Sequence, residues 1–471
     1  MIECINSFPD FSGSFDDERL DRRANQALNQ LVRGRNSSIR QVTRSKAEQK
    51  AFYRLLHHTK FSERNIEAAI VKRCGELSVG RHVLCLNDTS EFNLESHRGR
   101  LKPDSGVGKT TKEGILGFML HGSFVVDAHQ GTALGYSSIE LWHRPEDAPH
   151  DDGRHYQGRP IEEKESNKWI KATEQSRKTL CGARQITVVA DREADIYDLF
   201  GRYATTGVQL LIRSKSDRQV NDNKEKVTAC LLRQPEQHSY TIEVKGDIRK
   251  GIEKRKVVVA LKWTSVELRK PKSCHDKSLP DKVRVRVVEA KEKGEDGGIY
   301  WRLYTTHAVN SAGEAIQIVE WYKQRWHIEQ LFRLLKLQCF QIESSQLETG
   351  WAVRRLTMLA LLAALRIIQM MLAYEDDNEQ PAEEVFTKEE QLCLQQADKT
   401  LQGGTEKLSN PHQPHTLKWA TWIIARLGGW KGYVSQRKAG PVVLHRGLIK
   451  FYHLFEGWQL AQQFYKDVGT Q

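Results

Sequence analysis

The sequence predicts an α/β protein with helical segments at both ends. Residues 15–35, 37–58 and 61–77 have the periodicity of helices, with Ser38 and Ser62 at candidate N-cap positions. From residue 81, short β-rich runs alternate with a helical segment, which is typical of a mixed sheet. A later stretch, about 240 to 305, alternates apolar and charged residues as β-strands do.

The expected elements follow this order along the chain. Residues 1–80 form a small helical domain or, alternatively, a helical lid on the main body. We expect strands at 82–88, 115–127, 131–142 and 186–191, a helix at 162–177, and an all-β module at about 225–305. A helix at 322–336, an apolar helix at 356–372, an acidic linker region at 375–415 and a helical region at 416–471 complete the chain. Its 471 residues exceed the usual size of one hydrophobic core, so we expect several domains.

The net charge of +12 comes mainly from two basic segments. Residues 33–60 contain eight basic residues and one acidic residue, and residues 245–293 contain 16 basic and seven acidic residues. Such clusters are typical of proteins that bind a polyanion, because each neutralised phosphate releases counterions. They also occur as solvated faces without a partner, so both alternatives stay open.

Cysteine spacing and hydrophobicity indicate the compartment. The eight cysteines are scattered without a CxxC pair or CxxH spacing, so we expect neither a zinc site nor a disulfide scaffold, and a cytoplasmic protein. The N-terminus, MIECINSFPDF, lacks a basic region followed by an apolar one, so we expect no secretory signal. The apolar stretch 356–372 contains Arg366 and is too short for a bilayer span, which predicts a buried core helix and no membrane partner.

The segment GVGKTT at 106–111 resembles the end of a phosphate-binding loop, but the complete motif is absent. The motif requires glycine at position 103, where the chain has Pro103, and no buried strand precedes it. We therefore expect no nucleotide cofactor. Gly106, Gly108 and Lys109 instead predict a turn between two strands, with Lys109 available to a backbone phosphate.

Asp88 and Asp191 each end an apolar run, VLCLND and ITVVAD respectively. A carboxylate at the end of a strand is held rigidly at the rim of a sheet. If the two strands are neighbours, the pair makes a site for a hard divalent cation such as Mg²⁺. Taken singly, each aspartate also fits a turn or N-cap residue. Glu193 and Asp195 fit residues that cap or orient the following helix, without a metal role.

The segment YKQRWHIEQLFRLLK, residues 322–336, predicts an amphipathic helix with two faces. At about 100° per residue, one arc of about 80° holds Tyr322, Arg325, Glu329, Arg333 and Lys336. A separate apolar stripe is formed by Trp321, Ile328, Leu331, Phe332 and Leu335. The charged arc fits a surface ladder of i,i+4 pairs. It also fits a phosphodiester site, in which the acid holds a metal and the cations hold phosphate.

In this order the residues resemble a known family. Asp88, then Asp191 within VVADREADIY, then the segment 322–336 resemble the DDE transposases of bacterial cut-and-paste elements, in the IS-four group to which the Tn-five transposase belongs. The signature Y-x2-R-x3-E-x6-K of that group is met by Tyr322, Arg325, Glu329 and Lys336. Further local similarity lies in WHRPED (142–147), EKESNKW (163–169), LLIRSK (210–215) and IARLGGW (424–430). The resemblance is weaker over the first 80 residues and within 375–415.

The resemblance implies an RNase H-like catalytic core over residues 81–374, with the all-β module inserted at about 225–305. In such a core, Asp88, Asp191 and Glu329 bind two divalent ions, Mg²⁺ or Mn²⁺. One ion activates the attacking water or 3′-hydroxyl, and the other stabilises the leaving oxygen. Members of the family cut the end of the element, form and reopen a DNA hairpin, and join the end to target DNA.

The resemblance also implies DNA contacts. Tyr322, Arg325 and Lys336 would hold terminal phosphates, and Arg213 and Lys168 lie in the similar segments. Trp301 is placed like a strand tryptophan that receives an unstacked base, although a core tryptophan fits the same pattern. Residues 1–80 resemble the end-recognition domain, with these candidate contacts: Arg22, Arg23, Arg33, Arg35, Arg40, Arg44 and Lys46. Since QIESSQLETG follows the signature without basic residues, DNA contact just past Lys336 is expected to be weaker or placed differently.

The expected partners are double-stranded DNA, as terminal inverted repeats and as target, and a second copy of the chain. The second copy is implied because residues 416–471 resemble the family's dimerisation region. The expected location is the bacterial cytoplasm, in association with the nucleoid. Two other hypotheses are a DNA-binding regulator or domesticated relative that does not cut, and an RNase H-like nuclease without strand transfer. Three intact carboxylates favour the transposase, because a non-catalytic protein has no need of them.

Overall fold

A computed structural model describes residues 10–34, 38–110, 114–145, 159–223, 225–244, 255–294, 298–375, 379–402, 409–433 and 438–468. Arg35, one of the predicted DNA contacts, lies outside these ranges. So do residues 245–254 of the second basic segment.

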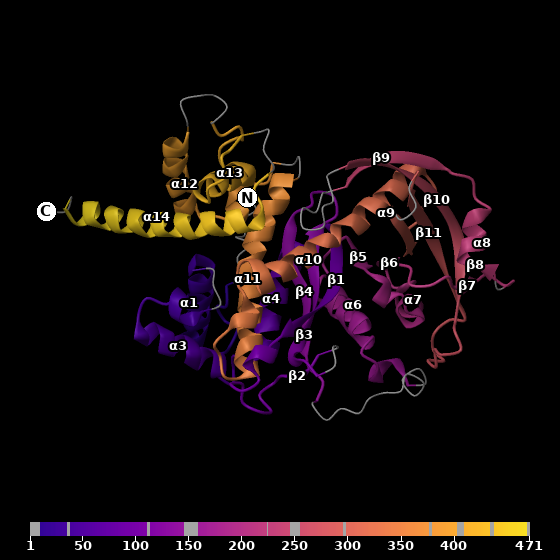
Figure 1. Cartoon of the computed structure of the whole chain (residues 1–471), viewed down its shortest axis with the longest axis horizontal. Coiled ribbons are helices and arrows are strands. Elements are labelled where there is room, and N and C mark those ends of the chain that lie inside the picture. The colour runs from indigo at the N-terminus through magenta and orange to yellow at the C-terminus, as the bar shows by residue number, and fades with distance from the viewer. Residues whose placement is uncertain are drawn as a thin grey trace.

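Four helices form the N-terminal part: α1 (Glu18–Gly34), α2 (Ile39–Val42), α3 (Lys46–His57) and α4 (Glu63–Leu77). The segment 37–58 is divided, because Ser45 starts a new helix by accepting a hydrogen bond from the Glu48 N–H. Ser62 caps α4 as predicted, whereas Ser38 has the N-cap position of α2 without a side-chain cap bond. The helices α1, α3 and α4 pack against the long helix α11 (Gly350–Glu375), which runs vertically through the centre of Figure 1.

One twelve-stranded sheet occupies the centre of the described chain. Its order is β2-β3-β1-β5-β6-β12-β11-β10-β7-β8, with β4 beside β3 and β9 beside β10. The strands β1, β5 and β6 run parallel to one another, and the other pairs are antiparallel. This mixed sheet agrees with the predicted α/β class. The bounds are β1 (His82–Asn93), β2 (Gly108–Lys109), β3 (Leu116–Asp127), β4 (Ala133–Trp142), β5 (Gln185–Ala190), β6 (Val208–Arg213), β7 (Gln219–Val220), β8 (Glu225–Lys226), β9 (His238–Val244), β10 (Arg255–Arg269), β11 (Lys282–Glu292) and β12 (Tyr300–Thr305).

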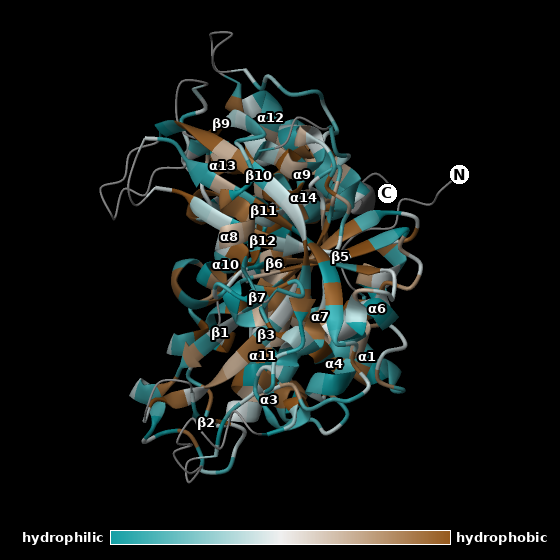
Figure 2. Ribbon diagram, turned by 90° about the vertical axis from the view of Figure 1, so that its right-hand side faces the viewer, coloured by the Kyte–Doolittle hydropathy of each residue, from teal (hydrophilic) through white to brown (hydrophobic). Residues whose placement is uncertain are grey.

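Helices cover both faces of the parallel strands. In β1, Leu84 and Leu86 belong to the apolar cluster that includes residues of α9 (Ala312–Gln324), α10 (Trp326–Arg333) and α11. Val83 and Cys85 point to the other face, toward α6 (Asn167–Thr179) and α7 (Tyr197–Tyr203). Figure 2 shows hydrophobic residues along these central strands and hydrophilic residues on the helices around them. Strands buried on both faces explain why their sequence reads as continuous apolar runs.

Strands β9 to β12 extend the same sheet, since β12 pairs with β6 from Leu303↔Arg213 to Thr305↔Leu211. The range 225–305, expected as an inserted all-β module, is therefore continuous with the central sheet and also contains α8 (Val227–Leu232). In β10, Val259 faces the cluster of α9 while Val266 faces that of α7 and α8. Each face of the extension is thus partly covered by helices.

The expected helix at 322–336 consists of three consecutive pieces. Arg325 separates α9 from α10, and a π-helical turn, Leu334–Gln338, follows α10. A π-helix has more residues per turn than an α-helix. A projection at a constant angle therefore misplaces Lys336, the last residue of the charged arc.

The C-terminal part contains α12 (Lys388–Leu401), α13 (Leu417–Leu427) and α14 (Pro441–Val468). The helix α12 lies in the range 375–415, which was expected to be an acidic linker. Thr387 and Glu390 start it with a capping box, a local signal that the acidic composition concealed. The last part of α14 extends away from the body of the protein, as Figure 1 shows.

The helix α11 contains the apolar stretch 356–372. Among the described residues it is the one helix long and apolar enough to cross a membrane, and 94% of its most apolar window is buried inside the protein. The Arg366 guanidinium pairs with Glu390 of α12 at 3.3 Å. The prediction of a buried core helix is confirmed.

Candidate active site

Asp88 and Asp191 lie at the same end of two neighbouring parallel strands. The strands β1 and β5 pair from His82↔Gln185 to Leu86↔Val189, and Asp191 immediately follows β5. Asp88 does not end its strand, contrary to expectation, because β3 continues to pair with β1 as far as Asn93. Asp88 nevertheless lies just beyond the last residue that pairs with β5, so the parallel part of the sheet ends there.

Arg325 joins Asp88 to Glu329. Its Nη1 donates a hydrogen bond to Asp88 Oδ2 at 3.1 Å, and its Nη2 donates to Glu329 Oε1. Only 12% of the Arg325 side chain is exposed. The contact between Arg325 and Glu329 is the i,i+4 pair expected of a surface ladder, but this pair faces the strand that carries Asp88.

These charges alter the protonation of the site. Burial raises the pKa of Asp88 to about 6, with Arg325 and the Thr89 N–H opposing the change and Glu329 and Asp191 adding to it. Burial alone would lower the pKa of Arg325, but Asp88, Tyr322 and the other acids outweigh it and the pKa is raised. Arg325 therefore stays a cation among the three carboxylates.

Tyr322 is buried rather than displayed on an open polar face. Its hydroxyl donates to Asp191 Oδ1 at 3.5 Å, and its ring meets that of Trp301 edge to face at 5.8 Å. Burial, followed by the charge of Asp191, raises the pKa of Tyr322, while Arg213 lowers it by charge and a hydrogen bond. Tyr322, Asp191, Arg213 and Trp301 thus lie together, as elements distant in sequence converge.

Lys336, in the π-helical turn, lies beside the last residues of β1, beyond Asp88. Its Nζ is 3.9 Å from Glu343 Oε1 and 5.3 Å from the centre of the Phe92 ring. The π-helical turn carries it toward this end of the strand. The first acidic residue after the signature therefore contacts the signature lysine directly.

Trp326 is a residue that the sequence interpretation missed. It is 41% exposed, and the Arg333 guanidinium lies 4.7 Å from its ring centre. At about 100° per residue, Trp326 falls at about 40° from Tyr322, just beyond Arg333 at the edge of the charged arc. The signal available in the sequence was an aromatic residue at the edge of a charged helical face, next to Arg333 in projection.

The other predicted DNA contacts have varied surroundings. Lys168 pairs with Glu193 at 3.2 Å and is mostly buried, whereas Lys109 lies on the edge strand β2. Arg33 lies 3.5 Å from Glu456 of α14, and Arg44 also pairs with Glu456. Of the predicted contacts in α1 and the first basic segment, five are exposed: Arg22, Arg23, Arg40, Arg44 and Lys46.

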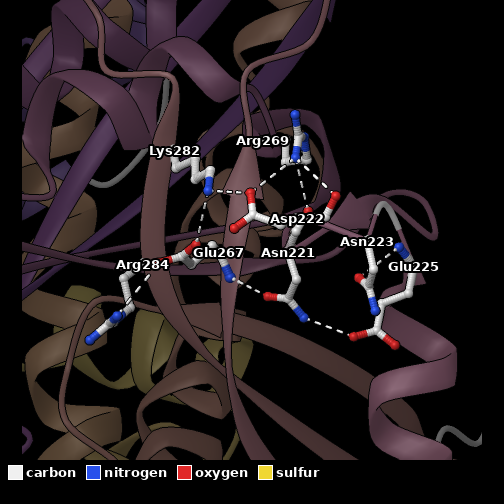
Figure 3. A network of polar contacts seen from close by, with 8 residues as sticks. All are labelled: Asn221, Asp222, Asn223, Glu225, Glu267, Arg269, Lys282 and Arg284. Atoms are coloured by element: carbon white, nitrogen blue, oxygen red, sulfur yellow. Dashed lines mark hydrogen bonds and ion pairs between the residues drawn. The ribbon is translucent and has the colours of Figure 1, made fainter.

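The second basic segment is partly neutralised within the protein, as Figure 3 shows. Asp222 accepts hydrogen bonds from Lys282 and, at 3.4 Å, from Arg269 Nη1. Glu267 lies 3.7 Å from Lys282 and 3.5 Å from Arg284. Part of the positive charge of β10 and β11 is therefore satisfied by the protein's own acids.

The three carboxylates suit a divalent cation in chemistry, because hard oxygen donors are the ligands that Mg²⁺ prefers. Asp88, Asp191 and Glu329 come from β1, the end of β5 and α10, all at one end of the parallel strands. In the described part of the chain no three acidic, histidine or cysteine side chains stand close enough to hold one ion as they are. The Arg325 guanidinium lies between Asp88 and Glu329.

Two family models match the sequence. A transposase DDE domain matches residues 155–366, and a transposase DNA-binding domain matches residues 12–61. Both models describe parts of transposases, and together they support a DDE transposase. The DDE match includes Asp191 and the whole segment 322–336, whereas Asp88 lies before its first residue. The sheet joins Asp88 to the matched domain, because β1 lies between β3 and β5.

The matches agree with the coarse expectations from the sequence. A DDE domain implies an RNase H-like core, and DDE transposases generally use divalent metal ions. The DNA-binding match covers α1, α2 and α3, and its range also contains the first basic segment. This match therefore supports DNA as a partner of the chain.

Proposed function

We propose that this transposase moves a bacterial insertion sequence of the IS-four group by a cut-and-paste mechanism, as the Tn-five transposase does. One observation carries the proposal: Asp88, Asp191 and Glu329 lie around Arg325 and Tyr322 at one end of the parallel strands. Three acids from three elements, together with the residues of the family signature, are what two-metal phosphoryl transfer requires.

Asp88, Asp191 and Glu329 would hold two divalent ions, Mg²⁺ or Mn²⁺, which supply activation of a water or 3′-hydroxyl and stabilisation of the leaving oxygen. Arg325 exchanges its contacts with the carboxylates for a DNA phosphate. Tyr322 and Arg213 hold the terminal nucleotide beside Asp191, and Lys336 contacts the backbone farther along β1. The Trp301 ring, next to Tyr322, receives the base that leaves the stack when a hairpin forms.

The remaining parts recognise the ends of the element and bring them together. The exposed cations of the N-terminal helices bind the terminal repeats. A second copy of the chain pairs through α14, whose exposed residues Leu454, Leu460 and Phe464 offer apolar surface. The reaction takes place on DNA in the bacterial cytoplasm.

A cleavage assay tests the proposal. The purified protein, incubated with Mg²⁺ or Mn²⁺ and a duplex that carries an end of the element, is expected to nick the DNA and release hairpin-ended products on a denaturing gel. Asp88→Asn, Asp191→Asn and Glu329→Gln each remove a metal-holding charge at nearly constant shape. We expect each to lower cleavage on the order of 10³-fold or more while the protein still binds the duplex.

The control is Asp127→Asn, the same chemical change on the same sheet at the end of β3. The Asp127→Asn protein is expected to cleave DNA at the normal rate under conditions in which it is folded. Binding of the duplex without any cleavage by the unmodified protein would instead favour a regulator that does not cut. Cleavage without joining of the cut end to a second DNA would favour a nuclease.

A further inference from the structure

A buried ion pair joins the two loops that follow β5 and β6. Asp195, in the loop after β5, has a side chain with 0% exposure, and that of its partner Arg218 is 17% exposed. Asp195 Oδ1 accepts a hydrogen bond from Arg218 Nε at 2.8 Å, and Oδ2 accepts one from the Lys215 N–H at 2.8 Å. Arg218 also donates to the Asp195 carbonyl oxygen. Both carboxylate oxygens are therefore used to hold the neighbouring loop.

This role differs from the one that the sequence favoured. Asp195 was expected to cap or orient the helix that follows it, but Ile196 has the N-cap position of α7. The carboxylate instead faces a segment 20 residues farther along the chain, the separation between Asp195 and Lys215. A buried carboxylate costs desolvation energy, which a charged partner and a backbone donor offset only when the geometry is good. The pair therefore fixes the relative position of the two loops.

The two loops carry residues of the candidate active site. Asp191 begins the loop after β5, and Arg213 is the last residue of β6, which is parallel to β5. The Tyr322 hydroxyl lies between them, donating to Asp191 and interacting with Arg213. Tyr322 thus links Asp191 to Arg213, and the Lys215 N–H links Asp195 to the segment that follows Arg213. Because Asp191 and Asp195 belong to one short segment and Arg213 and Lys215 to another, the two links hold these segments together at two points.

A second anchor fixes the same loop on the sheet extension. Arg302 Nη1 donates to Asp217 Oδ1 at 3.2 Å, and the Thr228 N–H donates to the same oxygen at 2.9 Å. The side chains of Lys215 and Ser216, in the same loop, are exposed. The loop is thus held at both sides while its tip stays open at the same end of the sheet as Asp191.

We propose that Asp195 and Arg218 are positioning residues that hold Arg213 beside Asp191, in the geometry with which the transposase binds the end of its DNA. The inference rests on the proposed function for the nature of the ligand. It adds that two residues outside the family signature, neither of which touches DNA, determine whether Arg213 contacts it productively.

Asp127 provides a matched control. Its carboxylate is 7% exposed, accepts from Arg81 Nη1 at 3.2 Å, and also accepts the N–H groups of His129 and Gln130 at 2.8 Å. It lies at the end of β3 opposite Val83, near the start of β1 and so at the other end of the strand from Asp88. Asp127→Asn and Asp195→Asn therefore remove the same charge from the same kind of buried, arginine-paired site.

The experiment is a double-mutant cycle on DNA affinity. A fluorescent duplex that carries the end of the element is titrated in chelator, so that binding is measured apart from cleavage. We expect Asp195→Asn to weaken binding by about tenfold in the native background but by less than about twofold in the Arg213→Gln background. Asp127→Asn should have the same small effect in both backgrounds, because it does not act through Arg213.

An equal loss in both backgrounds, or a loss no larger than that of Asp127→Asn, would overturn the proposal. Thermal unfolding shows whether each variant is folded at the assay temperature. Arg218→Gln breaks the same pair from the other side and enters the same cycle if Asp195→Asn does not fold. The unmodified protein is also assayed for cleavage with Mn²⁺. If it binds but does not cut, the proposed function fails while the affinity cycle still decides this inference.

Discussion

At the scale of single residues, Arg325 shows how one side chain can fit two interpretations at once. It forms the i,i+4 pair with Glu329 that a surface ladder would contain, and it also donates to Asp88 from a distant strand. A ladder contributes little when it is exposed to water. This one is largely removed from water, so breaking it leaves buried charges without partners.

Removing the negative charge of Glu343 should increase DNA binding. Glu343→Gln keeps the Oε1 that accepts the Asn93 N–H at 2.9 Å, but removes the charge that faces Lys336 at 3.9 Å. On the proposed role of Lys336, a DNA phosphate would compete with Glu343 for this lysine, so we expect affinity to rise by about threefold. The salt dependence of binding should become steeper, which titrations at several salt concentrations measure.

The control for this prediction is Glu348→Gln. Glu348 is 67% exposed and lies 4.0 Å from the exposed Lys102, so the change in net charge is the same without contact to Lys336. Equal gains in affinity from the two variants would contradict the prediction, because they would show a general charge effect.

Residue spacing predicted which residues of the site to examine, but not how deeply they lie. The pattern of Asp88, Asp191 and Glu329 was visible because the ends of apolar runs and helical spacing leave a signal in the sequence. The burial of Tyr322 was not visible, since a helical projection gives an angle without saying which side chain covers it. Trp301, from a strand of the extension, provides that cover.

At the scale of elements, the largest difference concerns the helix expected at 322–336. Its division into α9, α10 and a π-helical turn depends on contacts that periodicity does not record. In the turn, the Cys339 and Phe340 N–H groups both bond to the Leu334 carbonyl, at 3.2 and 3.0 Å. This change of hydrogen bonding redirects Lys336 toward Phe92 and Glu343. π-Helical turns often occur at functional sites.

The helices α1 and α14 are joined by one acidic residue. Glu456 of α14 pairs with both Arg33 and Arg44, two of the predicted DNA contacts. Glu456→Gln removes the charge that holds them, so we expect affinity for duplex DNA to rise by about two- to threefold. Fluorescence anisotropy at low salt measures the change.

Glu389→Gln is the matched control for this prediction. Glu389 lies on α12 near α14, where Gln459 donates to it at 3.5 Å. It makes the same change in net charge in the same C-terminal part. A gain from Glu389→Gln as large as that from Glu456→Gln would show that the contact between α1 and α14 does not restrain Arg33 and Arg44.

At the scale of the whole molecule, the sequence predicted the α/β class and most strands, because apolar runs and alternation are local properties. It did not predict that β9 to β12 continue the central sheet. The pairing of β12 with β6 joins segments separated by about 90 residues, as in Leu303↔Arg213, and no local pattern encodes such a partner. The continuous sheet matters, because it brings Trp301 to Tyr322.

The stability of the whole fold should depend on two histidines at the sheet end opposite Asp88. His82 opens β1, and the Thr187 hydroxyl lies 2.8 Å from Nε2 of both His82 and His307. Burial lowers the pKa of His82 from 6.5 to about 4, with His129 and Arg184 adding to the change and Asp127 opposing it. Burial, together with His82, likewise lowers the pKa of His307 to about 4.

A lowered pKa means that the unfolded chain binds protons more readily than the folded one below pH 6.5. Stability from the neutral histidines is therefore complete above pH 6.5 and is lost as the pH falls toward 4. We expect a loss of about 2 kcal/mol in unfolding free energy for each histidine over this range. Urea unfolding of the double variant His82→Asn, His307→Asn should show a flatter pH profile, whereas exposed His275→Asn should not. A double variant as steep as the native protein would place the acid sensitivity in other groups.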